Sequence, residues 1–243
     1  MENYQKFLDR INSFEKKCWN FAPGDFTGNP SLAKKVKQDN SFRPFYGDTV
    51  VFDLDVTTKE RLAKWLDKLY AEVPECFAKR LASDTFHMTL HDLGNAEVVD
   101  DIANELAQNE KKVQLLCEKL KAVENTGIIR MRSNCIFNMV NTSLVLGLYP
   151  ADAVEHEKLM NLYEAFNEVK ELSYPLTPHI TLAYYNVHGF DETSAKKLEK
   201  LVYQLNSGEI GQEMEIVLEA KELFYQHFDS MNHYINVLSV FGE

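Results

Sequence analysis

Two short segments of this chain contain side chains that can transfer protons and stabilise negative charge. They are His87-Met88-Thr89-Leu90 and His179-Ile180-Thr181-Leu182, in a chain of 243 residues with seven histidines. In an extended strand, residues i and i+2 point to the same face, so each segment presents an imidazole beside a hydroxyl. Two such pairs facing each other could provide the acid, the base and the oxyanion hydrogen bonds of a phosphoryl transfer. We therefore predict one active site with four catalytic residues: His87, Thr89, His179 and Thr181.

The two histidines would divide the proton transfers between them. An unperturbed imidazole titrates at about 6.5, so one ring can be neutral and accept a proton while the other is protonated and donates one. One would activate water or a 2′-hydroxyl group, and the other would protonate the departing oxygen. Thr89 and Thr181 would donate hydrogen bonds to the non-bridging phosphate oxygens. Which histidine is the acid depends on the orientation of the substrate and stays open at this point.

A zinc site is the main alternative for the first segment, because His87 and His91 are spaced as in H-E-x-x-H. That motif requires a helix and a Glu as general base, whereas Met88 stands at the Glu position here, within a strand pattern. We therefore expect neither a catalytic metal nor another cofactor. His91 is interpreted as a surface residue at the end of the strand, or as a residue at the border of the cleft.

Three further residues are candidates for substrate binding. Tyr185 follows Thr181 on the same predicted strand face, where a phenol could stack on a base or bond a phosphate. Arg130 lies on a predicted strand at 128–132, and its guanidinium would suit a phosphate unless this is a solvent-facing edge strand. Tyr46 precedes the first strand and would lie near the edge of the cleft. Three residues near the C-terminus are interpreted as either core or cleft wall: Phe228, Met231 and Tyr234.

The elements around the two motifs occur twice in the same order. A strand at 49–54 leads into a helix opened by the capping box at 57–60, then into the first motif strand and a second helix. The same series recurs from a strand at 143–148 onward, with the second motif strand at 179–185. Matching motifs in matching halves indicate an internal duplication, with a pseudo-twofold axis between the two histidines.

This repeat predicts an α/β (α+β) fold with two pseudo-symmetric lobes, each made of a sheet and helices, around a central cleft. We expect one bilobal domain over 47–243, with lobes formed by about 47–142 and 143–243. Residues 1–46 fall outside the repeat. We interpret them as an extension packed on the outside of the lobes or, alternatively, as a flap over the cleft.

At the two motifs the sequence resembles the 2H phosphoesterase superfamily, which is named for paired H-x-T/S-hydrophobic segments. The match lies at His87-Met88-Thr89-Leu90 and at Pro178-His179-Ile180-Thr181-Leu182-Ala183, and Leu93-Gly94 looks like the bacterial 2′-5′ RNA ligase and cyclic phosphodiesterase branch. Asp92 stands where that family commonly has an aromatic residue, and Tyr184 where it commonly has an arginine. The N-terminal extension is also not general in the family.

The resemblance implies a bilobal fold in which two antiparallel-rich sheets meet in a concave cleft, with both motifs on its floor and no metal required. It further implies activity on 2′,3′-cyclic, 1″,2″-cyclic or 2′,5′-linked phosphodiesters of nucleotides or RNA ends. The alternatives are 2′-5′ RNA ligation by the same residues and a non-catalytic protein that binds nucleotides or RNA ends. A purely structural domain would leave the symmetric His-Thr pairs unexplained.

The composition limits the partners. A formal net charge of −11 argues against duplex nucleic acid, which is gripped by clustered Lys and Arg, and leaves a small nucleotide or a single-stranded RNA end as the substrate. With 45% hydrophobic residues the chain can form a packed core, and we expect a monomer. Four cysteines without a CxxC pair suit a reducing compartment. The N-terminal residues and the rest of the chain lack long apolar runs, so we expect a cytoplasmic protein without membrane contact.

Overall fold

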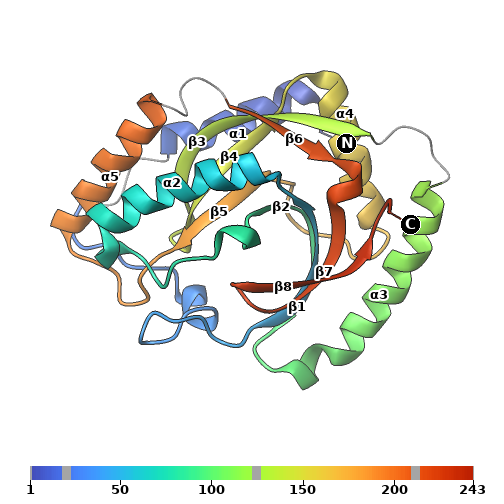
Figure 1. Ribbon diagram of the computed structural model, residues 1–243, viewed down its shortest axis with the longest axis horizontal. Coiled ribbons are helices and arrows are strands. Elements are labelled where there is room, and N and C mark those ends of the chain that lie inside the picture. The colour runs from blue at the N-terminus through green and yellow to red at the C-terminus, as the bar shows by residue number, and fades with distance from the viewer. Residues whose placement is uncertain (1, 18–22, 122–126, 209–213, 243) are drawn as a thin grey trace.

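The strands of the protein form a curled antiparallel sheet, with helices packed around it (Figure 1). The computed structural model describes residues 2–17, 23–121, 127–208 and 214–242. The strands are β1 (Tyr46–Asp53), β2 (His87–Ala96), β3 (Ile128–Met139), β4 (Ser143–Pro150), β5 (His179–Tyr184), β6 (Glu215–Glu219), β7 (Leu223–Ser230) and β8 (His233–Ser239). The helices are α1 (Tyr4–Lys17), α2 (Val56–Glu72), α3 (Val99–Lys121), α4 (Ala153–Phe166) and α5 (Glu192–Ser207), with short 3-10 turns η1 (Pro30–Lys34), η2 (Pro74–Cys76), η3 (Ser83–Thr85) and η4 (Ala220–Glu222).

The two motif strands are neighbours at the centre of the sheet. The strand order is β6-β3-β4-β5-β2-β1-β7-β8, so a single eight-stranded sheet replaces the two sheets that the resemblance implied. The halves meet where β5 lies beside β2, and these strands pair only at Met88 and Ile180. Both residues are the middle positions of the H-x-T motifs, and the narrow junction therefore places the two motifs side by side.

The two halves of the sheet do not follow the two halves of the sequence. β3 belongs to the predicted first lobe but lies beside β4, and β7 from the end of the chain pairs with β1. β3 and β4 are joined by a tight turn in which Val140 and Asn141 have positive φ and the Thr142 amide donates to the Met139 carbonyl. Such a turn holds consecutive strands together as a hairpin. A lobe boundary at 142/143 would divide that hairpin.

Aspartates begin three of the helices that surround the sheet. Asp55, Asp152 and Asp191 are the N-caps of α2, α4 and α5, and each side chain accepts hydrogen bonds from amides of the first turn. The predicted box at 57–60 therefore begins two residues late, because Asp55 accepts from both the amide and the hydroxyl of Thr58. Within the described ranges no helix has both the length and the apolar character needed to cross a bilayer.

The N-terminal extension divides into two parts with different neighbours. α1 packs against α4 and against β3 and β4, where Phe7 is fully buried and its ring meets His156 edge-on. The chain from η1 to Phe45 continues toward the cleft, and Lys35 and Phe45 from this stretch line it. The extension therefore combines packing on the outside of the sheet with a contribution to the cleft.

Candidate active site

The four predicted catalytic side chains line one cavity of about 550 Å³. Along each motif the middle residue is fully buried, whereas the histidine and threonine on either side are partly exposed. Because Met88 pairs with Ile180 in an antiparallel ladder, His87 lies across from Thr181 and His179 across from Thr89. The histidines are then diagonal neighbours on one face of the strand pair, within reach of each other's side chains.

Each imidazole is oriented by a backbone carbonyl two residues earlier. His87 Nδ1 lies 2.8 Å from the Thr85 carbonyl oxygen, and His179 Nδ1 lies 2.7 Å from that of Thr177. A carbonyl can only accept, so Nδ1 carries a hydrogen in both rings and Nε2 is left to exchange protons with a substrate. The sequence held a signal for this support, since the repeated unit extends back to Thr-x-His-x-Thr in both copies. Thr85 and Thr177 were not among the predicted site residues.

Burial favours the neutral form of both the His87 and the His179 imidazole in the free protein. Burial lowers the pKa of His87 to about 4, opposed by the hydrogen bond to Thr85 and assisted by the nearby His179. Burial also lowers the pKa of His179, and the Lys35 ammonium group acts in the same direction. Asp92 opposes the shift at both rings. An anionic phosphate between the imidazoles would likewise raise both pKa values and allow one ring to become protonated.

A β-bulge follows Thr89 and another follows Thr181, and each reverses the side-chain alternation. Opposite β1, Val51 pairs with Thr89 and Val50 with His91, so Leu90 is the extra residue. Opposite β4, Val145 pairs with Thr181 and Leu144 with Ala183, so Leu182 is the extra residue. An extra residue sends the following side chains to the other face of the strand. Asp92 and Tyr184 line the cavity as a result.

The bulges explain why His91 and Tyr185 do not lie where the period of two in a strand predicted them. His91 is neither a surface residue nor a cleft residue: it is 1% exposed, and its Nε2 lies 3.0 Å from Oδ1 of Asn167. Tyr185 does not line the cavity, because its ring is fully buried beside Phe26 and Phe77. Beyond Thr89 and Thr181, the period of two therefore no longer predicts which face of the strand a side chain occupies.

The other two predicted substrate-binding residues also lie outside the cavity. Arg130 is on β3, opposite Val217 of β6, and its guanidinium lies 3.6 Å from the carboxylate of Glu155 on α4. Tyr46 begins β1 opposite Ala96. It lies an odd number of residues from Thr49, which lines the cavity, so its side chain is on the opposite face of the strand. Its neighbour Phe45 lines the cavity instead. Among the described residues, no group of three or more His, Cys, Asp or Glu is placed to hold a metal ion.

Segments outside the motifs complete the cavity wall. Phe228, Met231 and Tyr234 line it, and Met231 is also part of the hydrophobic core. The Tyr234 ring meets His87 edge-on at 4.8 Å between centroids. The Lys35 ammonium group lies over the rings of Phe45 and Tyr184, at 5.5 and 5.6 Å from their centroids. It brings a positive charge to a cavity that has no arginine among its described lining residues.

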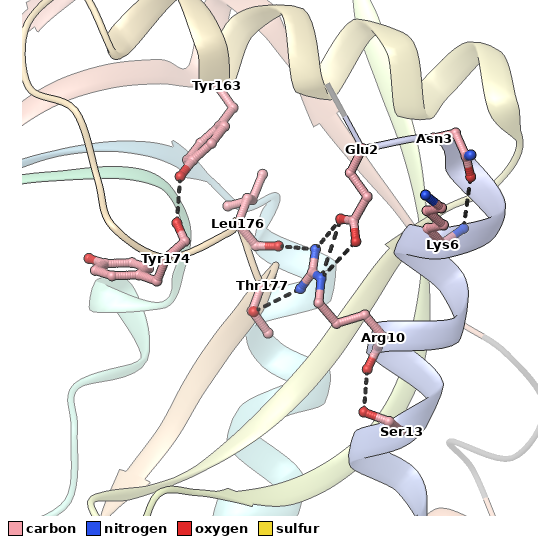
Figure 2. A network of polar contacts seen from close by, with 9 residues as sticks. All are labelled: Glu2, Asn3, Lys6, Arg10, Ser13, Tyr163, Tyr174, Leu176 and Thr177. Carbon is pink, nitrogen blue, oxygen red and sulfur yellow. Dashed lines mark hydrogen bonds and ion pairs between the residues drawn. The ribbon is translucent and has the colours of Figure 1, made fainter.

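α1 holds the segment that precedes the second motif (Figure 2). Arg10 donates to the Leu176 carbonyl at 2.9 Å and to the Thr177 hydroxyl at 3.2 Å, and its guanidinium also lies 2.7 Å from the carboxylate of Glu2. Thr177 in turn provides the carbonyl that orients His179. Arg10 therefore supports the second histidine through the backbone. No sequence pattern indicated this role, because the contact joins segments far apart in the chain.

A second chain of hydrogen bonds connects α4 with the cavity. The Tyr163 hydroxyl donates to the Tyr174 carbonyl at 3.0 Å, as Figure 2 shows, and the Tyr174 hydroxyl donates to Asp92 Oδ2 at 3.0 Å. Asp92 thus has a defined position beside both histidines. The acidic residue at this position, which departs from the family pattern, is built into the cavity wall.

Comparison with family models and with curated proteins gives no match. A solved structure, the conserved protein of unknown function ATU0111 from Agrobacterium tumefaciens str. C58, is similar with a TM-score of 0.60 and 15% identity, over 88% of this chain and 94% of that chain. E. coli LigT has a TM-score of 0.47 and 16% identity, over 80% of this chain and 95% of that chain. At such identities the likeness concerns the fold alone. The likeness to ATU0111 agrees with the expected mixed α+β fold.

Proposed function

We propose that this chain is a metal-independent phosphodiesterase of the 2H type, acting on cyclic or 2′,5′-linked phosphodiesters of small nucleotides or RNA ends. One observation carries the proposal. Two imidazoles from matching motifs line the same cavity, each with Nδ1 bonded to a carbonyl and each beside the threonine of the other motif. A structural role would need neither the symmetry nor two free Nε2 atoms.

The reaction requires one proton to be taken up and one to be released. The neutral imidazole accepts a proton at Nε2 from the attacking water while the water oxygen forms a bond to phosphorus. The bond from phosphorus to the departing oxygen breaks, and that oxygen takes the proton of the other imidazole, which the bound phosphate has kept charged. The two rings exchange protonation states in one turnover, and solvent restores them.

Thr89, Thr181 and Lys35 stabilise the negative charge of the phosphate. Thr89 and Thr181 donate hydrogen bonds to the non-bridging oxygens, where negative charge accumulates in the transition state. The Lys35 ammonium group, fixed over two aromatic rings, offsets the charge of the substrate. A cavity of about 550 Å³ has the size of a site for a small ligand. These features support a small nucleotide or an RNA end rather than a duplex.

A substrate panel tests the proposal. Purified protein is assayed with chelator on nucleoside 2′,3′-cyclic phosphates, 2′,5′-linked oligoadenylates and ADP-ribose 1″,2″-cyclic phosphate. We expect turnover of at least one class, and loss of that turnover in His87→Ala and His179→Ala. Binding without turnover of any of them would contradict the enzyme and favour the nucleotide-binding alternative. Joining of RNA ends without hydrolysis would favour the ligase alternative.

A further inference from the structure

A second, smaller pocket opens on the other side of His87. It has a volume of about 260 Å³ and shares three lining residues with the main cavity: Thr85, His87 and Tyr234. The Tyr234 ring, edge-on to His87, therefore stands between the two spaces. Pockets for whole ligands are usually larger, so this one suits a part of a molecule whose remainder lies in the main cavity.

The position of this pocket follows from strand register. Asp53 pairs with His87 across β1 and β2, so the two side chains share a face of the sheet. Gln226 pairs with Asn236 across β7 and β8. Gln226 also pairs with Thr49, which lines the main cavity and has the alternation of Asp53. The pocket is therefore an extension of the cavity floor from β2 across β1 to β7 and β8.

The pocket offers hydrogen-bond acceptors beside its amide, imidazole and hydroxyl groups. Gln226 is 8% exposed; its Nε2 donates to Oδ1 of Asn236 at 2.6 Å, while its buried Oε1 has no hydrogen-bond partner among the described residues. A buried acceptor without a partner is unfavourable and would be satisfied by a donor from a ligand. Asp84 adds an exposed carboxylate on η3.

The two spaces differ in charge. Lys35 and Lys170 line the main cavity together with the carboxylate of Asp92, whereas none of the described residues that line the smaller pocket is Lys or Arg. Asp53, which lines the smaller pocket, is neutralised by Lys59 at 2.6 Å, and the carboxylate of Asp84 remains at the mouth. An anion is therefore favoured in the main cavity and disfavoured in the pocket. A neutral group that donates hydrogen bonds has the opposite preference.

We propose that this pocket binds the uncharged nucleoside part of the substrate through donors such as ribose hydroxyls or an exocyclic amine, while the phosphate lies between His87 and His179. The inference rests on the proposed function and adds the direction of the substrate. With the nucleoside on the His87 side, the oxygen that departs with it lies next to His87. His87 is then the acid that protonates this oxygen, and His179 the base that takes the proton of water.

The test compares two substrates, a nucleoside 2′,3′-cyclic phosphate and bis(4-nitrophenyl) phosphate, which has no nucleoside. Gln226→Met keeps the length of the side chain and removes the Oε1 acceptor, together with the Nε2 donor to Asn236. We expect it to raise KM for the nucleoside substrate about tenfold, the usual order for one lost hydrogen bond, and to change kcat/KM for the aryl diester less than about twofold. The matched control is Gln108→Met on the exposed face of α3, which should change neither value.

The outcomes separate the two proposals. Wild-type protein that cleaves neither substrate, nor any of the panel, would contradict the proposed function itself. Turnover with equal effects of Gln226→Met on both substrates, or with none on either, would overturn the pocket assignment alone. Circular dichroism and a thermal melt of each variant establish that it is folded.

A surface variant keeps the assignment testable should Gln226→Met fail to fold. Asp84 is exposed on η3, so Asp84→Lys does not disturb the core. A cation at the pocket mouth should favour a nucleoside 2′,3′-cyclic phosphate that carries an additional 5′-phosphate. We expect its kcat/KM, relative to the substrate without the 5′-phosphate, to rise several-fold over the wild-type ratio. An unchanged ratio would show that the nucleoside does not lie at this pocket.

Discussion

His87 and His179 have the same local strand geometry, but the segments that surround them differ. Each ring is bonded through Nδ1 to the carbonyl two residues earlier, each strand has a bulge one residue after the threonine, and the motifs pair with each other. His87 adjoins the polar pocket and the edge of Tyr234. The segment before His179 is held by Arg10, and Lys35 lies near its ring. The duplicated strands therefore provide equal groups, and the segments outside the repeat make them unequal.

Removal of either imidazole tests what the two sites have in common. His87→Ala and His179→Ala should each lower kcat by about 10²–10⁴, the usual contribution of a positioned acid or base. His188, which is exposed and outside the cavity, provides the matched control, and His188→Ala should keep wild-type kcat. Steady-state rates on the best substrate of the panel measure the effect. Wild-type rates in both active-site variants would contradict paired-histidine catalysis.

A change of leaving group tests what separates the two histidines. A 4-nitrophenolate departs without needing a proton, so an aryl diester should be cleaved by His87→Ala with a smaller loss than a nucleoside substrate shows. His179→Ala should lose activity on both substrates to a similar degree, because water must still be activated. The ratio of kcat for the two substrates is measured in each variant. The reverse pattern would exchange the acid and the base.

The threonines should matter less than the histidines and about equally. Thr89→Val and Thr181→Val each remove one donor to the oxyanion, and we expect kcat to fall about tenfold or somewhat more with little change in KM. The measurement is steady-state kinetics of the two single variants and the double variant. A loss in only one of the two single variants would show that the phosphate is held asymmetrically.

Arg10 distinguishes the second site from the first. Arg10→Ala removes the hydrogen bonds to Leu176 and Thr177, so His179 loses its support while His87 keeps Thr85. We expect kcat to fall by about threefold to tenfold at unchanged KM, and Arg10→Lys to restore part of the lost kcat. In a plot of kcat against pH, only the limb that reports the titration of His179 should shift. Lys6→Ala, an exposed change on the same helix, is the control. A displacement of both pH limbs would indicate a general loss of structure.

The smallest expected effect concerns stability at acidic pH. The folded-state pKa of His87 is about 4, below the value of 6.5 for a free histidine, so the unfolded chain binds this proton first. The free energy of unfolding should therefore decrease as the pH falls from about 6.5 to about 4. In His87→Gln this contribution is absent, so the free energy of unfolding should decrease less over this pH range. Urea unfolding of both proteins across this range measures it, and parallel curves would contradict the lowered pKa.

The sequence by itself determined the two His-x-Thr pairs, the α+β class and the series of strands and helices around each motif. These features are local: a period of two places His87 with Thr89, and His179 with Thr181, on one face, and apolar spacing marks the helices. The fold and the common cavity agree with those expectations. The positions of Tyr46, Arg130 and Tyr185 do not.

Only the tertiary structure decided which residues complete the cavity. A bulge arises from how a strand pairs with its neighbour. Residues far away in the chain therefore determine that Tyr184 lines the cavity and Tyr185 does not, and that Asp92 lines it and His91 does not. The strand order also depends on distant segments, because β3 lies beside β4 and β7 lies beside β1. Lys35 and Arg10 reach the site across long sequence separations that no local pattern records. The two His-x-Thr pairs could be read from the sequence because each lies within one strand. Their surroundings could not, because pairing and packing between distant segments determine them.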